Sequence, residues 1–213
     1  MPDGFHGRIL RLDLTAGALR DERPGDNFYR QYLGGKGFVA YYLFKEVPPG
    51  VDPLGSENRL IFAAGVVSGA PVPGFSRFSV GAKSPLTGGY GESEAGGFWA
   101  AELKFAGYDA IVVQGKAEHP VYLWIHNGVA ELKDAGHLWG LDTAQTQARI
   151  KQELGDQRVQ VACIGPAGRW GCAAERGSTW PIPPGCRKSP GGSRGTSGRT
   201  RPASLYTTKA RSG

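Results

Sequence analysis

Two short features within residues 83–115 carry residue types that could do chemistry. Gly96 and Gly97 are adjacent. A backbone without Cβ atoms can approach a flat ligand, and its N–H groups can face an anion near a helix start. Glu92 and Glu94 are one residue apart, so on an extended segment both carboxylates would lie on one face. A tight turn and two solvated charges are the alternative interpretation. Because no opposing acid or base accompanies the glutamates, the segment predicts cofactor binding rather than catalysis.

The histidines and cysteines of the sequence do not follow a metal-binding pattern. No two histidines are four residues apart, and the cysteine spacing fits neither paired zinc ligands nor a disulfide framework. Neither a G-x-S-x-G elbow nor a Walker loop is present. We therefore predict no catalytic residue and no protein-held metal, and we expect Cys163, in the apolar run VQVACIGPAG, to be a small buried side chain. The residues considered are His6, His119, His126, His137, Cys163, Cys172 and Cys186.

Alternating strands and helices are predicted to position this segment. Alternating apolar residues and turn signals predict strands, and apolar residues at helical spacing predict helices. Asn127-Gly128 is a strong signal for a tight hairpin turn. The predicted strands cover 7–15, 18–21, 59–65, 77–82, 109–114, 121–126, 129–133 and 158–164. The predicted helices cover 26–47, with a glycine bend midway, then 98–105 and 142–154, and residues 88–97 are predicted to form a loop.

These elements predict one α+β domain with largely antiparallel sheets over residues 1–168, followed by a tail over 169–213. The domain holds 16 basic and 18 acidic residues, whereas the tail holds 9 basic residues and Glu175 alone as an acid. The tail is also rich in glycine, proline, serine and threonine. Such a segment buries too little apolar surface to offset its ordering entropy, so we expect it to be disordered.

Targeting signals give only default expectations. No apolar run approaches the roughly 20 residues of a membrane-spanning helix, and the first residues lack the order of a secretory signal. We therefore expect a cytoplasmic protein with no membrane partner. The basic tail could bind nucleic acid or another acidic partner through charge. Only Trp170, Trp180 and Tyr206 could stack on bases there, and no nucleic-acid-binding motif accompanies them, so nucleic-acid binding is the weaker alternative.

Several longer runs resemble a known family. The run GGFWAAELKFAGYDAIVVQGKAEHPVYLWI, with LGGKG, PPGVDPLG, RFSVGAKSPLTGG, HLWG and CIGPAG, resembles the N-terminal domain of the aldehyde ferredoxin oxidoreductase family over residues 5–168. The resemblance implies that this domain is the base for a tungstopterin, in which two pterins hold one tungsten with magnesium. It also implies that the intact enzyme carries a 4Fe-4S cluster, oxidises aldehydes to carboxylic acids and passes the electrons to ferredoxin.

The resemblance assigns three residues to cofactor binding. Arg77 matches a family arginine between pterin and cluster, where a fixed cation would stabilise anionic ligands. Gly96 matches a glycine whose backbone contacts the pterin. Glu94 falls where a characterised member has asparagine, which adds a negative charge beside an anionic, magnesium-linked cofactor. Lys83 and Ser84, in the KSPLTG run, are expected to be neighbours of the cofactor.

The resemblance ends after Gly168, where RWGCAAERGSTWPIPPG stands in place of the family's GRGG-type pterin segment. The cluster cysteines, in a Cys-x2-Cys-x3-Cys group, are absent as well. We therefore expect this chain to be inactive alone, and a shifted reading frame would explain the abrupt break. Alternatively, the domain is a non-catalytic scaffold that joins a separately encoded remainder or forms a homodimer. The identity of the aldehyde, and of tungsten or molybdenum, stays open.

Overall fold

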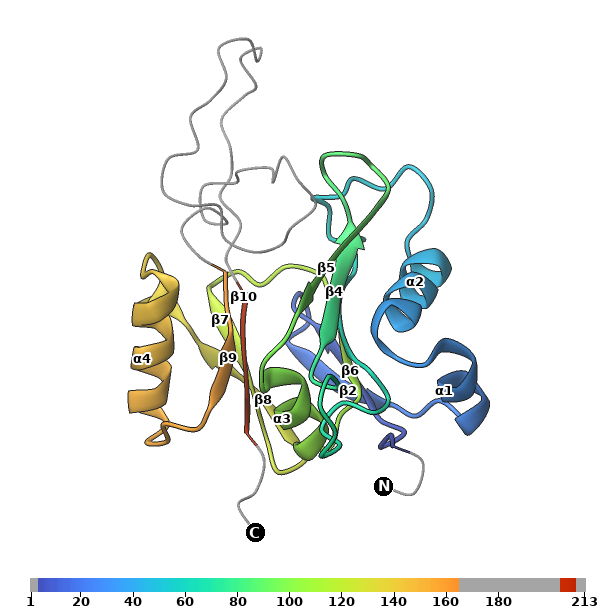
Figure 1. Ribbon diagram of the computed structural model, residues 1–213. Coiled ribbons are helices and arrows are strands. Elements are labelled where there is room, and N and C mark those ends of the chain that lie inside the picture. Colours follow the sequence, from blue (N-terminus) through green and yellow to red (C-terminus); the bar gives the residue numbers. More distant parts are fainter. Residues whose placement is uncertain (1–3, 165–203, 210–213) are drawn as a thin grey trace, which may run out of the picture.

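The computed structural model describes residues 4–164 and 204–209, which form two β-sheets and four α-helices (Figure 1). The strands are β1 (Ile9–Asp13), β2 (Ala18–Glu22), β3 (Leu60–Ala64), β4 (Phe78–Lys83), β5 (Tyr90–Ala95), β6 (Ala110–Gln114), β7 (Val121–His126), β8 (Val129–Asp134), β9 (Gln160–Ala162) and β10 (Ser204–Lys209). The helices are α1 (Asp26–Tyr32), α2 (Gly35–Glu46), α3 (Trp99–Phe105) and α4 (Thr143–Glu153). The predicted α+β class is confirmed.

The larger sheet has six strands in the order β2-β1-β6-β3-β4-β5, and only the β1–β6 pair is parallel. The central strands are apolar on both faces, which explains why their sequences read as continuous apolar runs. The prediction of a loop over 88–97 is wrong in part, because Tyr90–Ala95 form the edge strand β5. Its glycine and glutamate residues hide the strand from a pattern that looks for apolar residues.

Helices α1 and α2 cover one face of this sheet and meet at a sharp bend. Leu33 and Gly34 have φ of 57° and 74°, a left-handed conformation that glycine adopts without strain. A Cβ on Gly34 would also collide with the carbonyl oxygen of Ala64. The two helical pieces predicted across a glycine bend are therefore confirmed. Their aromatic side chains pack in one cluster with Ile61 and Val112 of the sheet.

The four-stranded sheet has the order β8-β7-β10-β9 and lies between α3 and α4 (Figure 1). Asn127 and Gly128 have φ of 48° and 80°, as the predicted hairpin between β7 and β8 requires. Helix α4 begins with a capping box between Asp142 and Gln145. The expectation of disorder for 169–213 is wrong for Ser204–Lys209, which pair with β7 and β9, and the rest of that segment lies outside the described residues.

A buried ion pair holds the N-terminal segment against the end of α3. Lys104 is fully buried, and its Nζ lies 2.5 Å from Oδ1 of Asp109 and 2.7 Å from the Gly4 carbonyl oxygen. The Asp109 carboxylate also accepts hydrogen bonds from the backbone N–H groups of His6 and Arg8. Burial, the largest influence, lowers the pKa of His6. Each buried charge is therefore paired, so the loss of either partner would leave an uncompensated charge.

Candidate functional site

The candidate site lies at one end of the β4–β5 hairpin. Phe78 pairs with Ala95 in the antiparallel register, so Arg77, just before β4, and Gly96, just after β5, are brought to the same end. Glu94, opposite Ser79, lies one residue inside that end. The structure therefore brings together the three residues predicted to bind a cofactor, from parts of the sequence that are 17 residues apart at the nearest.

Two cations face two anions at this end of the hairpin. Glu92 and Glu94 lie on the same face of β5, as their spacing predicts for an extended segment. The Lys36 Nζ, in the first turn of α2, lies 3.2 Å from a Glu94 carboxylate oxygen and 3.8 Å from one of Glu92. The Arg77 guanidinium lies 3.9 Å from Glu94. We call these four residues with Gly96 and Gly97 the hairpin rim.

The cations of the hairpin rim remain open to solvent. The side chains of Lys36 and Arg77 are 62% and 68% exposed. Ion pairs at such exposure are screened by water and contribute at most about 1 kcal/mol to stability. An anionic ligand could therefore displace Glu94 from Arg77 at small energetic cost. The negative charge of Glu94 reduces the attraction for that ligand, and Lys36 offsets part of this reduction.

The glycines of the rim leave the backbone accessible. A Cβ on Gly96 would meet no atom within 4 Å, and Gly97 has φ of 91°, which disfavours any residue with a side chain. Phe98 is 73% exposed, whereas Trp99 is buried against Phe62 and Phe78. The loop is thus anchored by a packed indole and presents free backbone to solvent. A flat ligand could lie against Gly96 without a steric clash.

Two buried polar atoms near the rim have no hydrogen-bond partner: Glu92 Oε1 and Trp99 Nε1. Burial, followed by the charge of Glu92, raises the pKa of Tyr90 to about 12, so the phenol stays protonated at neutral pH. The carboxylate and the phenol supply hydrogen-bonding groups, but they contain no base poised for proton transfer. The geometry supports binding, in agreement with the absence of a catalytic residue from our expectations.

Lys83 and Ser84 lie at the opposite end of the same hairpin. Lys83 pairs with Tyr90, six residues along β4 from Phe78, which corresponds to roughly 20 Å of strand. The Ser84 hydroxyl accepts backbone hydrogen bonds from Leu86 and Thr87 and shapes the turn. These two residues are therefore separated from the hairpin rim, and their local contacts account for them as turn residues.

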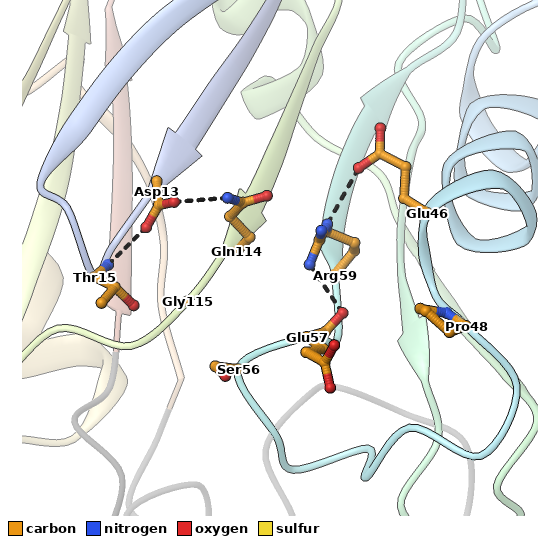
Figure 2. Close-up of a pocket in the computed structure, with 9 residues that line it drawn as sticks. All are labelled: Asp13, Thr15, Glu46, Pro48, Ser56, Glu57, Arg59, Gln114 and Gly115. Carbon is orange, nitrogen blue, oxygen red and sulfur yellow. Dashed lines mark hydrogen bonds and ion pairs between the residues drawn. The ribbon is translucent and has the colours of Figure 1, made fainter.

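A second polar region opens between the ends of β1, β3 and β6, where a pocket is lined by acidic, basic and hydroxyl side chains (Figure 2). Gln114 donates a hydrogen bond of 2.6 Å to Asp13, and Gly115 has φ of 76° beside Thr15. Hydrogen bonding from Gln114, the largest influence, lowers the pKa of Asp13. The polar groups of this pocket already satisfy one another. The lining residues are Asp13, Thr15, Glu46, Pro48, Ser56, Glu57, Arg59, Gln114 and Gly115.

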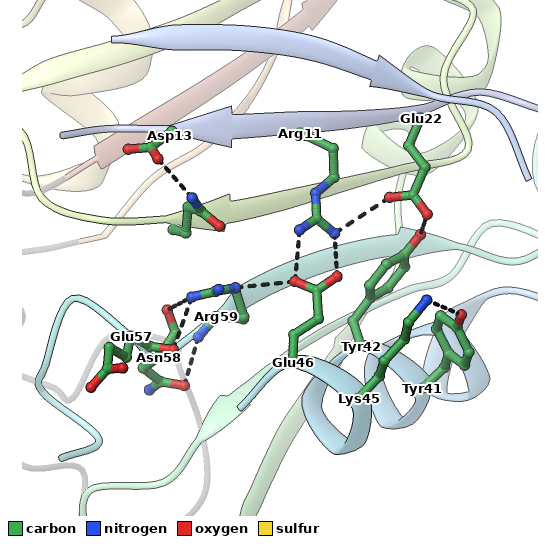
Figure 3. A network of polar contacts seen from close by, with 11 residues as sticks. Arg11, Asp13, Glu22, Tyr41, Tyr42, Lys45, Glu46, Glu57, Asn58 and Arg59 are labelled. Carbon is green, nitrogen blue, oxygen red and sulfur yellow. Dashed lines mark hydrogen bonds and ion pairs between the residues drawn. The ribbon is translucent and has the colours of Figure 1, made fainter. Parts of the chain in front are cut away.

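The pocket borders a charge network that ties α2 to the sheet (Figure 3). Arg11 donates two hydrogen bonds, of 2.7 and 2.6 Å, to the Glu46 carboxylate, and Arg59 donates a third of 3.1 Å. Burial opposes ionisation of Glu46, but the two arginines outweigh it and hold its pKa below the usual range. Glu22 accepts from Arg11 and from the Tyr42 hydroxyl. The saturation of these groups identifies the network as structural.

Other titratable groups are placed by packing. Cys163 is buried, which raises the pKa of its thiol to about 11, so the prediction of a buried structural cysteine is confirmed. His137 lies 2.9 Å from Glu153, which also accepts from the Tyr122 hydroxyl. Within residues 4–164 and 204–209, no three metal-binding side chains form a group. None of the helices in that part has the length and apolar character of a membrane span.

The family model for the N-terminal domain of aldehyde ferredoxin oxidoreductase matches residues 9–175. The chain belongs to this family. It is 48% identical over 165 residues to a tungsten-containing aldehyde ferredoxin oxidoreductase of Pyrococcus abyssi, which covers 78% of the chain and 27% of the relative. It is 35% identical over 156 residues to the WOR-like subunit of an aliphatic sulfonate oxidoreductase of Pyrococcus furiosus, covering 72% of the chain and 25% of the relative.

A solved structure of the same fold belongs to the active site complex BamBC of benzoyl coenzyme A reductase. It superposes with a TM-score of 0.76 at 44% identity and covers 78% of the chain and 25% of that chain. The aldehyde ferredoxin oxidoreductase N-terminal domain is thus found in relatives whose names give different substrates. The chain spans about a quarter of the length of these relatives.

The hairpin rim is compatible with the anionic pterin cofactor that the family implies. Arg77 is an exposed cation, and the open space over Gly96 leaves room for a flat ring system. Lys36 is the residue of the rim that sequence reasoning missed, although it belongs to the LGGKG motif. Its helix position only becomes informative once α2 is known to begin beside β5. A cation just inside a helix start was the available signal.

Proposed function

We propose that this chain is the cofactor-base fragment of a tungsten-pterin oxidoreductase. The observation that carries the proposal is the convergence of Arg77, Glu94 and Gly96 at one rim, with Lys36 added from α2. Arg77 would bind anionic groups of the cofactor, and the Gly96 backbone would contact its flat ring. Glu94, where a family member has asparagine, would join the coordination of magnesium while Lys36 balances its charge. When bound, the cofactor supplies a metal centre that exchanges electrons with a carbonyl-level substrate.

The reaction proposed for the intact enzyme is aldehyde oxidation. An aldehyde and water give a carboxylate, three protons and two electrons, and a 4Fe-4S cluster passes the electrons to ferredoxin. The described residues of this chain supply cofactor binding and solvent exclusion at the rim, and they contain no group placed for the proton transfers. The chain by itself is therefore expected to show no aldehyde-dependent reduction of ferredoxin.

Reduction of an aromatic coenzyme A thioester is the second candidate function. It is favoured by the 44% identity to the active site complex of benzoyl coenzyme A reductase, which is close to the 48% identity with the aldehyde enzyme. The rim is compatible with either reaction, because both would place the substrate on parts of the enzyme outside this domain. Parallel assays with an aldehyde and with an aromatic thioester separate the two.

The test grafts residues 9–164 into the Pyrococcus abyssi enzyme in place of the matching segment. The graft is expected to retain tungsten and pterin, and Arg77→Met is expected to lower both contents severalfold. Arg23→Met is the matched control, because Arg23 is 69% exposed and lies 3.9 Å from Asp21, as Arg77 is 68% exposed and 3.9 Å from Glu94. Metal analysis and pterin fluorescence provide the measurements. Equal contents in both variants would overturn the assignment of Arg77.

A further inference from the structure

The centre of the four-stranded sheet is occupied by a strand that comes from far along the chain. β9 ends at Ala162 and β10 begins at Ser204, so 41 residues, 163–203, connect two adjacent antiparallel strands. A loop of two to five residues is enough for that connection. β10 lies between β7 and β9 and pairs with both (Figure 1). The connection length shows that chain proximity is not what keeps β10 in place.

The strand position between β7 and β9 is apolar on both faces of the sheet. Paired residues of neighbouring strands lie on the same face. Leu123 and Ala162 flank the position of Tyr206, and both belong to the cluster that includes α3. Trp124 and Val161 flank the next position, and both belong to the cluster on the α4 side. Consecutive positions thus lie in opposite apolar layers.

A strand buried on both faces is expected to be a continuous apolar run, as β3 and β6 are. The segment Ser204–Lys209 reads SLYTTK, with one aliphatic residue in six. The position therefore demands a more apolar strand than the one this chain provides. A flexible linker of this length maintains its strand at a local concentration of about millimolar or less. A better-fitting strand from another molecule could compete at that level.

We propose that the space between β7 and β9 is a strand-acceptor site for an extended apolar segment of a different polypeptide, and that β10 is its exchangeable occupant. The partner's strand would run parallel to β7 and antiparallel to β9, as β10 does. The matched family domain is only 27% of the length of a relative, so a chain that carries the rest of such an enzyme is the kind of partner that fits. The inference does not rest on the proposed function, because strand binding needs no cofactor.

The test uses the full chain and a variant that lacks residues 204–213. The probe is a fluorescent peptide of about ten residues, with six alternating valines and isoleucines between lysines, and its control carries two prolines, which cannot donate to a sheet. Fluorescence anisotropy is expected to show binding to both proteins, about tenfold tighter to the truncated one. The proline peptide is expected to bind neither protein.

Hydrogen exchange locates the binding and keeps the test informative if the truncated variant fails to fold. In the full chain, excess peptide is expected to expose the amides of Ser204–Lys209 while β7 and β9 stay protected. Protection that increases only along the outer edge of β8 would overturn the proposal, as would the absence of binding. A dimer that forms without peptide and disappears on truncation would make a second copy the occupant and would overturn the proposal as stated.

Discussion

The six-stranded sheet takes every strand from residues 9–114, whereas the four-stranded sheet takes a central strand from residues 204–209. The first sheet is closed by contacts among neighbouring parts of the chain, including a buried ion pair and a network of three charged side chains. The second depends on a strand whose connection covers 41 residues, 163–203. The comparison teaches that a domain can contain one self-sufficient layer, which carries the candidate cofactor rim, and one layer that depends on distant chain.

The largest effect is expected from breaking the ion pair of the self-sufficient layer. Lys104→Met leaves the Asp109 carboxylate buried without its cation, which should lower the free energy of unfolding by about 3–5 kcal/mol. Chemical denaturation followed by tryptophan fluorescence measures the change. Lys116→Met, at an exposed lysine, is the control and should have little effect. Equal stability of the two variants would show that the pair contributes nothing to the first sheet.

Ile150→Ala tests whether the second layer unfolds separately. Ile150 is fully buried between α4 and the four-stranded sheet, and loss of its side chain should destabilise that layer by about 2–5 kcal/mol. Hydrogen exchange should show lost protection in β7 and β9 while β1, β3 and β6 keep theirs. Gln147→Ala, on the exposed face of α4, should leave exchange unchanged. Simultaneous loss of protection in both sheets would mean that they form one cooperative unit.

Acid should weaken the first layer through Glu46. Because the folded pKa of Glu46 lies below its unfolded value of about 4.3, its ion pairs stabilise the fold above that pH and are lost as pH falls through the folded pKa. Glu46→Gln should lower stability at neutral pH by about 1.5–3 kcal/mol. The difference between the two proteins should shrink between pH 5 and 3, as measured by denaturant titration at each pH, with about one unit of width. A constant difference would contradict the linkage.

The smallest change in stability is expected at the hairpin rim. Lys36→Gln removes an exposed ion pair with Glu94 and should change the free energy of unfolding by less than about 1 kcal/mol. In the grafted enzyme, the same change should lower pterin content, because Glu94 would then face the anionic cofactor with less compensation. Stability and cofactor content are measured on the same preparations. A large loss of stability would show that Lys36 holds the fold instead of balancing charge at the rim.

Most elements of the fold could be predicted from local patterns. The helical bend at Leu33 and Gly34, the Asn127-Gly128 hairpin and the α4 start at Asp142 each depend on backbone preferences of a few adjacent residues. β5 was missed because its glycines and glutamates carry no apolar alternation, and it is an edge strand that needs none. β10 was missed because its local composition indicates disorder, whereas two partner strands supply its hydrogen bonds.

The candidate site was only partly predictable. Arg77, Glu94 and Gly96 were assigned through family resemblance, and the antiparallel register of β4 and β5 then brought them together. Lys36 could not be placed, because its nearness to Glu94 depends on how α2 packs beside β5. The role of these residues in cofactor binding stays a prediction until metal and pterin contents are measured.

The sequence by itself determined the family, the α+β class and most helix and strand positions, because hydrophobic period, turn residues and capping residues act over a few neighbouring positions. Tertiary structure alone decided which strands are neighbours, which cations face which carboxylates and which strand fills the second sheet. These depend on contacts between residues far apart in the chain. The energy of such contacts is set by burial and register, which no local pattern records.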